Sequence, residues 1–340
     1  MTSSRQGPPS VLVAGGAGFV GSHLVEALLE EVSEVMVVDS FDTGSPRNLA
    51  SAIDDPRLAL ERASISDPLP PAVTGRRFDR IYHLASPASP VHYARLPLET
   101  LKVNSLGTMH LLELARRDDA RLLLASTSEV YGDPLVHPQP ETYWGNVNPN
   151  GPRSCYDEGK RFSESVTMTY VREHGLDARI ARIFNTYGPR SDPNDGRMIP
   201  NFCVQALRGQ DITVYGDGQQ TRSCCYVTDL VAGLVALMET PDLSGEVVNL
   251  GNPEEQTVLE IARRTADLAG SGSSIVHRPL PTDDPARRRP DIDKAQRLLG
   301  WSPTTSFEAG ISATLEYFRT LSEVQSEDSA RVAVGASPSG

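Results

Sequence analysis

The chain has 340 residues, of which 39% are hydrophobic and 22% charged, which is ordinary for a globular protein and excludes disordered and fibrous classes. A formal net charge of −12 disfavours nucleic-acid partners, and no apolar run approaches the ~20 residues of a membrane span. The four cysteines form no CxxC motif and no metal-ligand spacing with histidine, so we expect free thiols, no metal and a cytoplasmic protein.

The first half of the chain alternates short apolar runs with longer amphipathic stretches, a pattern typical of βαβ units and a parallel sheet. Residues 1–9 precede this pattern and are expected to form a disordered tail. The expected strands are Ser10–Ala14, Val35–Val38, Leu58–Glu61, Arg80–Ala85, Arg121–Ser126 and Ala178–Phe184, and the expected helices are Phe19–Glu31, Leu98–Arg117 and Asp157–His174. This order predicts an α/β fold with a doubly wound parallel sheet of the Rossmann type over residues 10–189.

After residue 189 the elements become shorter, with more Gly and Pro between them, which predicts a smaller α/β substrate domain over residues 190–321 with some chain crossing back. Residues 322–340 are expected to form a second disordered tail. The expected helices are Ile199–Arg208, Val227–Glu239, Thr257–Ala269, Ile292–Leu299 and Ser306–Leu321, with strands at Ile212–Tyr215, Val247–Leu250 and Ile275–His277. Ligands of open α/β sheets bind beyond the carboxyl ends of the strands, so this domain is expected to close a cleft over a cofactor.

A glycine-rich loop follows the first expected strand and opens a helix. Gly15, Gly18 and Gly21 stand at GxxGxxG spacing, which allows a tight turn and a close approach to a pyrophosphate at the helix N-terminus. Asp39 ends the second strand, near the ~20-residue separation expected for the acid that accepts both ribose hydroxyls. Its carboxylate would repel a 2′-phosphate, which favours NAD over NADP. A helix cap or a solvated strand end is the alternative for Asp39, but strand, loop, helix and acid agree on a dinucleotide site.

Tyr156 and Lys160 stand four residues apart and therefore share one face of the helix expected there. A nearby positive charge favours tyrosinate, so Tyr156 is a candidate general base, and Lys160 is also a candidate donor to a nicotinamide ribose. Taken alone, such a pair is usually only helix surface. Together with the glycine loop, it resembles the extended short-chain dehydrogenase/reductase superfamily.

Longer segments make the chain, from the loop to about Leu321, similar to the UDP-glucuronate decarboxylases (UDP-xylose synthases). They are His83–Pro90, Ser126–Pro134, Trp144–Pro149, Gly151–Arg161, Arg182–Arg190 and Tyr215–Ser223. Ser128, between Thr127 and Glu129, is the most diagnostic position. The related 4,6-dehydratases have an aspartate there that protonates a departing hydroxyl, and the 4-epimerases usually lack a counterpart of Glu129. The alternative is a Ser/Thr-rich strand end that leads into a turn, which would explain Thr127 and Ser128 but not the acidic Glu129.

The resemblance implies that UDP-glucuronate is oxidised at C4 by NAD, loses carbon dioxide from the resulting β-keto acid, and is protonated at C5 and reduced again to UDP-xylose. Tyr156 is then expected to remove and return the C4 hydroxyl proton, with Lys160 lowering its pKa, while Thr127 and Ser128 hydrogen-bond the reacting oxygens. Glu129 belongs to the site without an assigned role. Two alternatives stay open: another C4-oxidising nucleotide-sugar enzyme, forming a 4-keto-pentose or apiose, and a non-catalytic NAD-responsive binding protein.

The same resemblance implies two sets of binding residues. For the UDP-sugar they are Lys102, Asn185 near a phosphate, Asn201, Tyr215 near the uracil, Arg222 at the diphosphate, and Arg288, chosen from the run Asp284–Ile292. For NAD they are Gly15, Gly18, Phe19, Val20, Gly21, Asp39, Ser40, Thr43, Gly44, Ser64, Ile65, Leu84, Ala85, Ser86, Asn104, Ala125, Tyr156, Lys160 and Thr186. Ser64 stands where the family usually has aspartate, so a weaker hold on adenine is expected.

A homodimer is also expected from the resemblance, because in related enzymes the helices that carry Lys102 and Tyr156 pair with their counterparts as a four-helix interface. The apolar residues of these helices are Leu101, Leu111, Leu112, Leu114, Val166, Met168 and Tyr170. The alternative to a dimer interface is that these apolar residues pack in the core, because core-facing helices carry a similar apolar stripe.

Overall fold

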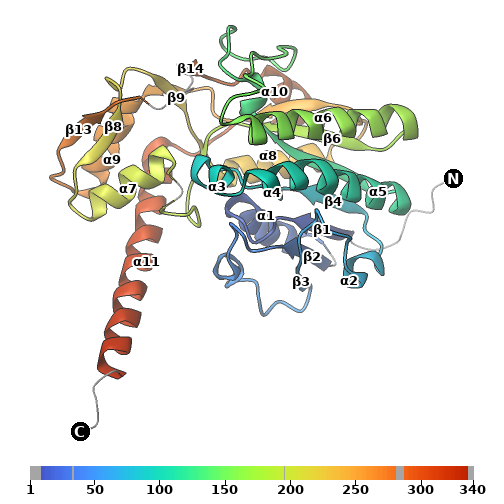
Figure 1. The fold of residues 1–340 in the computed structure, drawn as a ribbon, viewed down its shortest axis with the longest axis horizontal. Coiled ribbons are helices and arrows are strands. Elements are labelled where there is room, and N and C mark those ends of the chain that lie inside the picture. Colours follow the sequence, from blue (N-terminus) through green and yellow to red (C-terminus); the bar gives the residue numbers. More distant parts are fainter. Residues whose placement is uncertain (1–8, 33, 195, 281–286, 336–340) are drawn as a thin grey trace.

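A parallel sheet of seven strands forms the centre of the computed structural model, which describes residues 9–32, 34–194, 196–280 and 287–335 (Figure 1). The strand order β11-β6-β5-β4-β1-β2-β3 confirms the predicted doubly wound arrangement. The strands are β1 (Ser10–Ala14), β2 (Glu34–Asp39), β3 (Leu58–Arg62), β4 (Arg80–His83), β5 (Arg121–Thr127), β6 (Ala178–Ile183) and β11 (Val247–Leu250).

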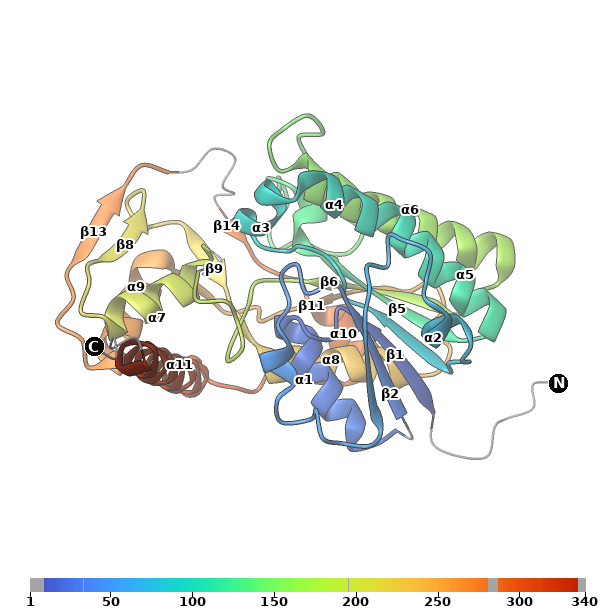
Figure 2. The same ribbon diagram turned by 60° about the horizontal axis from the view of Figure 1, so that its bottom comes forward.

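Helices cover both faces of this sheet, which is why its strands are apolar runs rather than alternating ones. Val11 and Val13 of β1 pack in one core cluster with α1 (Phe19–Leu29) and α8 (Val227–Glu239). Leu12 and Ala14 point to the opposite face and pack with α5 (Thr108–Asp118). Figures 1 and 2 show α1, α8 and α10 (Asp293–Leu299) on one face, and α4 (Pro97–Lys102), α5 and α6 (Ser154–His174) on the other.

The helix expected over Leu98–Arg117 is interrupted by a π-helical turn, Val103–Gly107, between α4 and α5. The Asn104 carbonyl within this turn accepts hydrogen bonds from Thr108 Oγ1 at 2.9 Å and from Ser163 Oγ of α6 at 2.6 Å. Because such a turn inserts one residue without changing the helical direction, hydrophobic periodicity does not reveal it.

A separate core cluster holds the smaller part of the molecule together. It comprises α7 (Met198–Leu207), α9 (Val258–Ala269), α11 (Phe307–Gly335) and the β8 (Ile212–Tyr215) strand, which pairs with β13 (Ile275–Arg278). Two small sheets lie beside the cleft, one of β12 (Glu255–Thr257), β9 (Thr221–Ser223) and β14 (Arg287–Arg288), the other of β7 (Thr186–Tyr187) and β10 (Cys225–Tyr226). The remaining helices are α2 (Pro71–Thr74), α3 (Pro90–Arg95) and two 3-10 turns, Pro46–Leu49 and Ser128–Tyr131.

The chain after residue 189 is divided between the two parts. Strand β11 joins the main sheet beside β6, and α8 packs on α1, so both belong to the larger part. At the C-terminal end, α11 continues to Gly335, where a disordered tail was expected from residue 322. An established helix adds residues without a new nucleation cost, which accounts for this difference. Residues 1–8 and 336–340 of the expected tails lie outside the described residues, and none of the described helices is long and apolar enough to cross a membrane.

Candidate active site

A cleft of about 960 Å³ lies over the carboxyl ends of β1, β4, β5 and β6 and is closed on its other side by the smaller part of the molecule. This is the position predicted for ligands of an open α/β sheet. The cleft brings together most of the residues predicted from the sequence: Gly15, Gly18, Phe19, Val20, Gly21, Thr43, Leu84, Ser86, Ala125, Thr127, Ser128, Glu129, Tyr156, Lys160, Asn185, Thr186, Asn201, Tyr215, Arg222 and Arg288.

Other predicted residues lie behind or away from the cleft lining, namely Asp39, Ser40, Gly44, Ser64, Ile65, Ala85, Lys102 and Asn104. Asn104 is buried and supports the lining from behind, since its Nδ2 donates to Ser86 Oγ at 2.9 Å. Lys102 is exposed on α4, and the structure does not bring it to the cleft. Two residues apart in a helix point in roughly opposite directions, so the inward position of Asn104 turns Lys102 toward solvent.

The loop between β1 and α1 and the first turn of α1 each have a glycine with no room for a side chain. A Cβ atom on Gly15, where φ is +82°, would lie 2.6 Å from the Ala85 backbone nitrogen, and one on Gly21 would lie 2.1 Å from the Gly15 carbonyl oxygen. Helix α1 begins at Phe19 with no side-chain cap and no acidic residue in its first turn. No side chain of the helix itself competes for the N–H groups of this turn, an arrangement that suits a bound phosphate.

Asp39 is held at the end of β2, beside this loop. Its Oδ2 accepts a hydrogen bond from the Ala17 amide at 3.0 Å, and its Oδ1 accepts one from the Phe41 amide at 2.9 Å. Burial raises the pKa of Asp39 in spite of these two donors. A carboxylate oxygen accepts more than one hydrogen bond, so both oxygens retain capacity for ribose hydroxyls. The loop, the uncapped helix and Asp39 together fit a dinucleotide.

Tyr156 lies near the start of α6, with its ring stacked on Tyr93 at 5.2 Å between centroids and 8° between planes. Burial raises the pKa of Tyr156 to about 12, although a hydrogen bond with Thr127 and the charge of Arg197 oppose this rise. The Lys160 ammonium donates to the Ala125 carbonyl oxygen at 2.8 Å, and burial lowers its pKa to about 7. The charge of Arg197 thus lowers the Tyr156 pKa, a contribution that spacing along the chain did not indicate, and the effect expected of Lys160 on Tyr156 stays a prediction.

Glu129 is the centre of a charged cluster. It follows Thr127, whose Oγ1 accepts a hydrogen bond from the Glu129 amide at 3.3 Å, and its carboxylate pairs with both Arg153 and Arg288. Burial disfavours the charged carboxylate, but the two guanidinium groups hold the Glu129 pKa below its ordinary value. Arg288 of β14 lies beside Arg222 of β9 across a parallel ladder, so the two predicted arginines enter the cleft from adjacent strands.

Sequence reasoning did not single out Arg153, Asp157 or Tyr93. Arg153 precedes α6 and lies one helical turn before Tyr156 and Asp157, so the i, i+3 and i, i+4 spacing was an available signal. Tyr93 comes from α3, and nothing in its local sequence indicates that its ring meets Tyr156.

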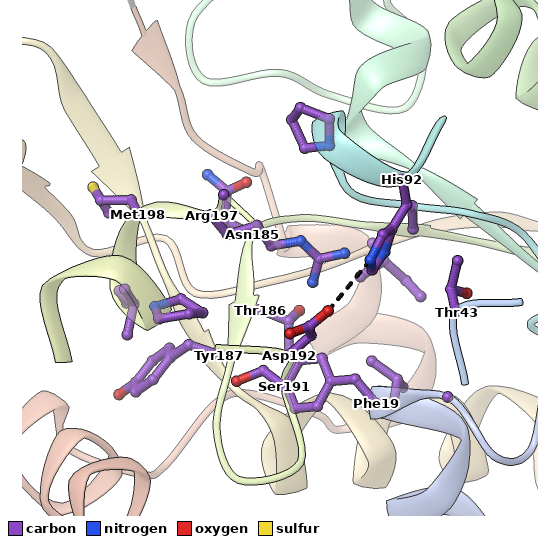
Figure 3. Close-up of a pocket in the computed structure, with 18 of the residues that line it drawn as sticks. Phe19, Thr43, His92, Asn185, Thr186, Tyr187, Ser191, Asp192, Arg197 and Met198 are labelled. Carbon is purple, nitrogen blue, oxygen red and sulfur yellow. Dashed lines mark ion pairs between the residues drawn. The ribbon is translucent and has the colours of Figure 1, made fainter. Parts of the chain in front are cut away.

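An ion pair also spans the cleft in Figure 3, between His92 of α3 and Asp192, which follows β7, with 3.3 Å between Nε2 and Oδ2. The same segment carries Arg190, which pairs with Glu26 of α1 at 2.6 Å. The chain after β7 is thus tied to both walls of the predicted dinucleotide site. No feature of the sequence indicates either contact, because the partners are far apart along the chain.

Known proteins resemble the chain over nearly its full length. Residues 12–314 match the family model described as GDP-mannose 4,6 dehydratase. UDP-glucuronic acid decarboxylase 1 of Xenopus tropicalis is 52% identical over 318 residues, covering 94% of this chain and 74% of the relative. UDP-glucuronic acid decarboxylase 3 of Arabidopsis thaliana is 52% identical over 310 residues, covering 91% of this chain and 89% of the relative.

Two solved structures are similar in fold and sequence. The UDP-glucose 4-epimerase of Thermotoga maritima, solved with UDP-glucose, has a TM-score of 0.84 and 32% identity, covering 92% of this chain and 99% of its own. The UDP-glucuronic acid 4-epimerase of Bacillus cereus, solved with UDP-glucuronic acid and NAD, has a TM-score of 0.83 and 29% identity, covering 92% of this chain and 99% of its own.

Proposed function

The chain belongs to the UDP-glucuronic acid decarboxylase family of extended short-chain dehydrogenases/reductases, and we propose that it converts UDP-glucuronate to UDP-xylose and carbon dioxide with NAD as a recycled cofactor. One observation carries this proposal: Tyr156 and Lys160 share a cleft with Glu129, which two arginines hold ionised. Ser128 stands beside them in place of the acid that a dehydratase needs to expel a hydroxyl group.

The glycine loop, the first turn of α1 and Asp39 would hold NAD, and the Asp39 carboxylate favours it over NADP. When bound, NAD would supply the redox chemistry that oxidises C4 of the sugar and reduces it again after carbon dioxide has left. The cofactor supplies this redox chemistry, whereas the protein orients the sugar and moves the protons.

Tyr156 takes the proton of the C4 hydroxyl group as C4 is oxidised and gives it back when C4 is reduced. A C4 ketone is needed because the electron pair of the C5–C6 bond must have an acceptor when carbon dioxide departs. Thr127, hydrogen-bonded to Tyr156, holds the phenol in place, and the Ser128 hydroxyl group donates to the C4 oxygen as charge builds on it. Burial raises the Tyr156 pKa to about 12, so the neutral phenol is the form that donates in the final reduction. The tyrosinate that the oxidation step requires is favoured by the hydrogen bond with Thr127 and by the charge of Arg197, which both lower this pKa.

The charged groups of the substrate require local cations, because the chain as a whole is acidic. Arg222 is proposed to meet the diphosphate and Arg288 the sugar carboxylate, since these neighbouring arginines approach the cleft from paired strands. Tyr215, at the end of β8, is 44% exposed and offers a ring face for the uracil. Asn185 and Asn201 complete the polar lining.

Incubation of the purified protein with UDP-glucuronate, without added NAD, tests the proposal. UDP-xylose and carbon dioxide, followed by NMR and mass spectrometry, are the expected products. Accumulation of a 4-keto sugar would instead show that the reaction stops after oxidation and decarboxylation. If the substrate stays unchanged although the protein retains NAD, the proposal that the protein is an enzyme is refuted. Tyr156→Phe should stop turnover while leaving NAD bound, and full residual activity would exclude Tyr156 as the proton acceptor.

We also propose that the protein is a homodimer through the outer face of α4, the π-helical turn and α6. Four large apolar side chains are exposed there: Leu98 (64%), Leu101 (40%), Leu106 (44%) and Phe162 (45%). Exposed patches of this kind are typical of interfaces. Leu111, Leu112 and Leu114, which were also expected at the interface, are buried in the core instead. Sedimentation of Leu106→Glu/Phe162→Glu protein should show monomer, and an unchanged dimer would exclude this face.

A cytoplasmic location is proposed as well. The cysteines Cys155, Cys203, Cys224 and Cys225 are free, which suits a reducing compartment. Cys225 lies in the core and Cys224 packs against the core of the smaller part, as expected for residues that serve packing.

A further inference from the structure

The proposed reaction consumes a proton, and this inference rests on that proposed function. When the C5–C6 bond breaks, its electron pair passes into the 4-keto system and neutral carbon dioxide leaves. A C–H bond then forms at C5, so each turnover takes up one proton from solution. Glu129 is held ionised by its two arginines, and the proton on Tyr156 returns to the C4 oxygen. Neither group accounts for the proton that is consumed.

Asp157 is a buried carboxyl group beside this chemistry with no role in the steps above. It follows Tyr156 in the first turn of α6, and only 7% of its surface is exposed. Its Oδ1 has no hydrogen-bond partner among the described residues, and its Oδ2 is 3.9 Å from Arg153 Nε. A buried carboxylate oxygen without a donor is costly, which favours the protonated form.

The charges around Asp157 come from several elements. Glu129 of the 3-10 turn and Glu158 of α6 raise its pKa, while Arg153 and Arg288 of β14 lower it. Burial is the largest influence, and the Asp157 pKa is raised to about 7. Uncharged groups also face Asp157, namely the side chains of Tyr93, Cys155 and Tyr156.

The protonation state of Asp157 sets the net charge of the cluster that faces the carboxylate of the substrate. Arg153 and Arg288 carry two positive charges and Glu129 one negative charge, so this cluster has a net charge of about +1 while Asp157 is neutral and about 0 once Asp157 ionises. We propose that Asp157 is a positioning residue whose neutral form leaves the Glu129–Arg153–Arg288 cluster with the single positive charge that binds the carboxylate of the substrate. Binding of the carboxylated sugar then draws one proton from solution onto Asp157, the same number that protonation of C5 consumes in each turnover.

The sign of the pH dependence follows from this count. Above pH 7 Asp157 ionises, the cluster loses its net charge, and the carboxylated substrate binds less tightly. Between pH 6 and pH 8.5 the dissociation constant for UDP-glucuronate should rise about 30-fold. UDP-xylose has no carboxylate, so its dissociation constant should not follow this trend. Asp157→Asn keeps the side chain neutral and of similar shape, and should remove most of the trend.

Calorimetric titration of the Tyr156→Phe holoprotein, in which turnover is blocked, separates the outcomes. At pH 8, in two buffers of different ionisation heat, UDP-glucuronate should bind with uptake of about one proton and UDP-xylose with about none. Equal uptake with both ligands, or none with either, would overturn the proposal for Asp157. Failure of UDP-glucuronate to bind at all would overturn the proposed function, and this inference with it.

The same titration on Tyr156→Phe/Asp157→Asn protein should show no proton uptake with UDP-glucuronate, and persistence of the uptake would assign the proton to another group. The comparison of the two ligands uses protein with Asp157 intact, so it decides the question even where the double variant does not fold. Kinetics of the Asp157→Asn single variant supply a further readout. Its KM for UDP-glucuronate should be flat from pH 6 to pH 8.5, and a KM that rises as in the parent protein would contradict the proposal.

Discussion

Replacement of Lys160 by methionine should stabilise the protein while it destroys activity. The Lys160 ammonium is buried, and burial lowers its pKa from 10.5 to about 7. Because the folded protein binds this proton more weakly than the unfolded chain, stability falls as pH decreases from 10.5 toward 7. Each pKa unit corresponds to ~1.4 kcal/mol. Keeping Lys160 in the cleft therefore costs about 4–5 kcal/mol of unfolding free energy near pH 7.

Methionine has a similar length and no charge, so Lys160→Met removes this cost. It also removes the 2.8 Å hydrogen bond to the Ala125 carbonyl oxygen, a loss of about 1–2 kcal/mol. The expected net gain at pH 7 is about 2–3 kcal/mol, and it should disappear by about pH 9.5, where the lysine is neutral in the folded protein and its remaining penalty is small. We expect turnover to fall at least ~100-fold, because Lys160 is the predicted donor to the nicotinamide ribose.

Urea unfolding of both proteins, stripped of nucleotide and measured from pH 6.5 to pH 9.5, checks this prediction. Lys294→Met is the matched control, because Lys294 donates to the Val247 carbonyl oxygen at 2.7 Å but its side chain remains 24% exposed and pairs with Glu246. The control should be slightly destabilised, without the pH trend. A Lys160→Met protein that is no more stable than the parent at pH 7, or a gain that persists unchanged at pH 9.5, would refute the reasoning.

Two further substitutions test the cluster and the loop. Glu129→Gln leaves Arg153 and Arg288 without their anion and should lower the unfolding free energy by about 1–3 kcal/mol at pH 7. Because the Glu129 pKa is depressed in the folded protein, this difference from the parent should shrink as pH falls below about 4 in urea unfolding, and a difference independent of pH would contradict the assignment. Gly21→Ala would place a Cβ atom 2.1 Å from the Gly15 carbonyl oxygen and should cost about 1–3 kcal/mol of stability. It should also yield protein with little bound NAD when the nucleotide is released by heat and assayed; full occupancy would show that the loop tolerates the methyl group.

Features set by neighbouring residues were predictable from the sequence. The apolar run of β1, the glycines that follow it and the start of α1 at Phe19 are local, and the structure has them where they were expected. The bounds of β8, α8 and β11 also agree with the prediction, and turn residues flank both strands and follow the helix. The cleft likewise lies at the strand ends, since parallel strands direct their carboxyl ends to one edge of the sheet.

Spacing along the chain did not predict which charged side chains reach the cleft or which groups they contact there. Periodicity placed Lys102 on the helix that borders the cleft, but a π-helical turn and the inward position of Asn104 leave it in solvent. The i, i+4 spacing of Tyr156 and Lys160 placed both side chains on one face of α6, but it did not indicate that the lysine donates to the Ala125 carbonyl oxygen of β5 or that Arg197 lowers the tyrosine pKa. Spacing along a helix specifies a shared face, but it does not specify which group from another element meets that face.

The sequence by itself determined the first six strands of the sheet, the dinucleotide loop and the chemical identity of Tyr156, Lys160 and Glu129, because these depend on local conformation and on residue type. The place of β11 in the same sheet was decided by the tertiary structure. Only the tertiary structure decided that Arg153 and Arg288 meet at Glu129, and that Asp157 is buried beside them. Arg288 comes from β14, far along the chain from Glu129. Electrostatic energy depends on distance and burial, and folding alone establishes both.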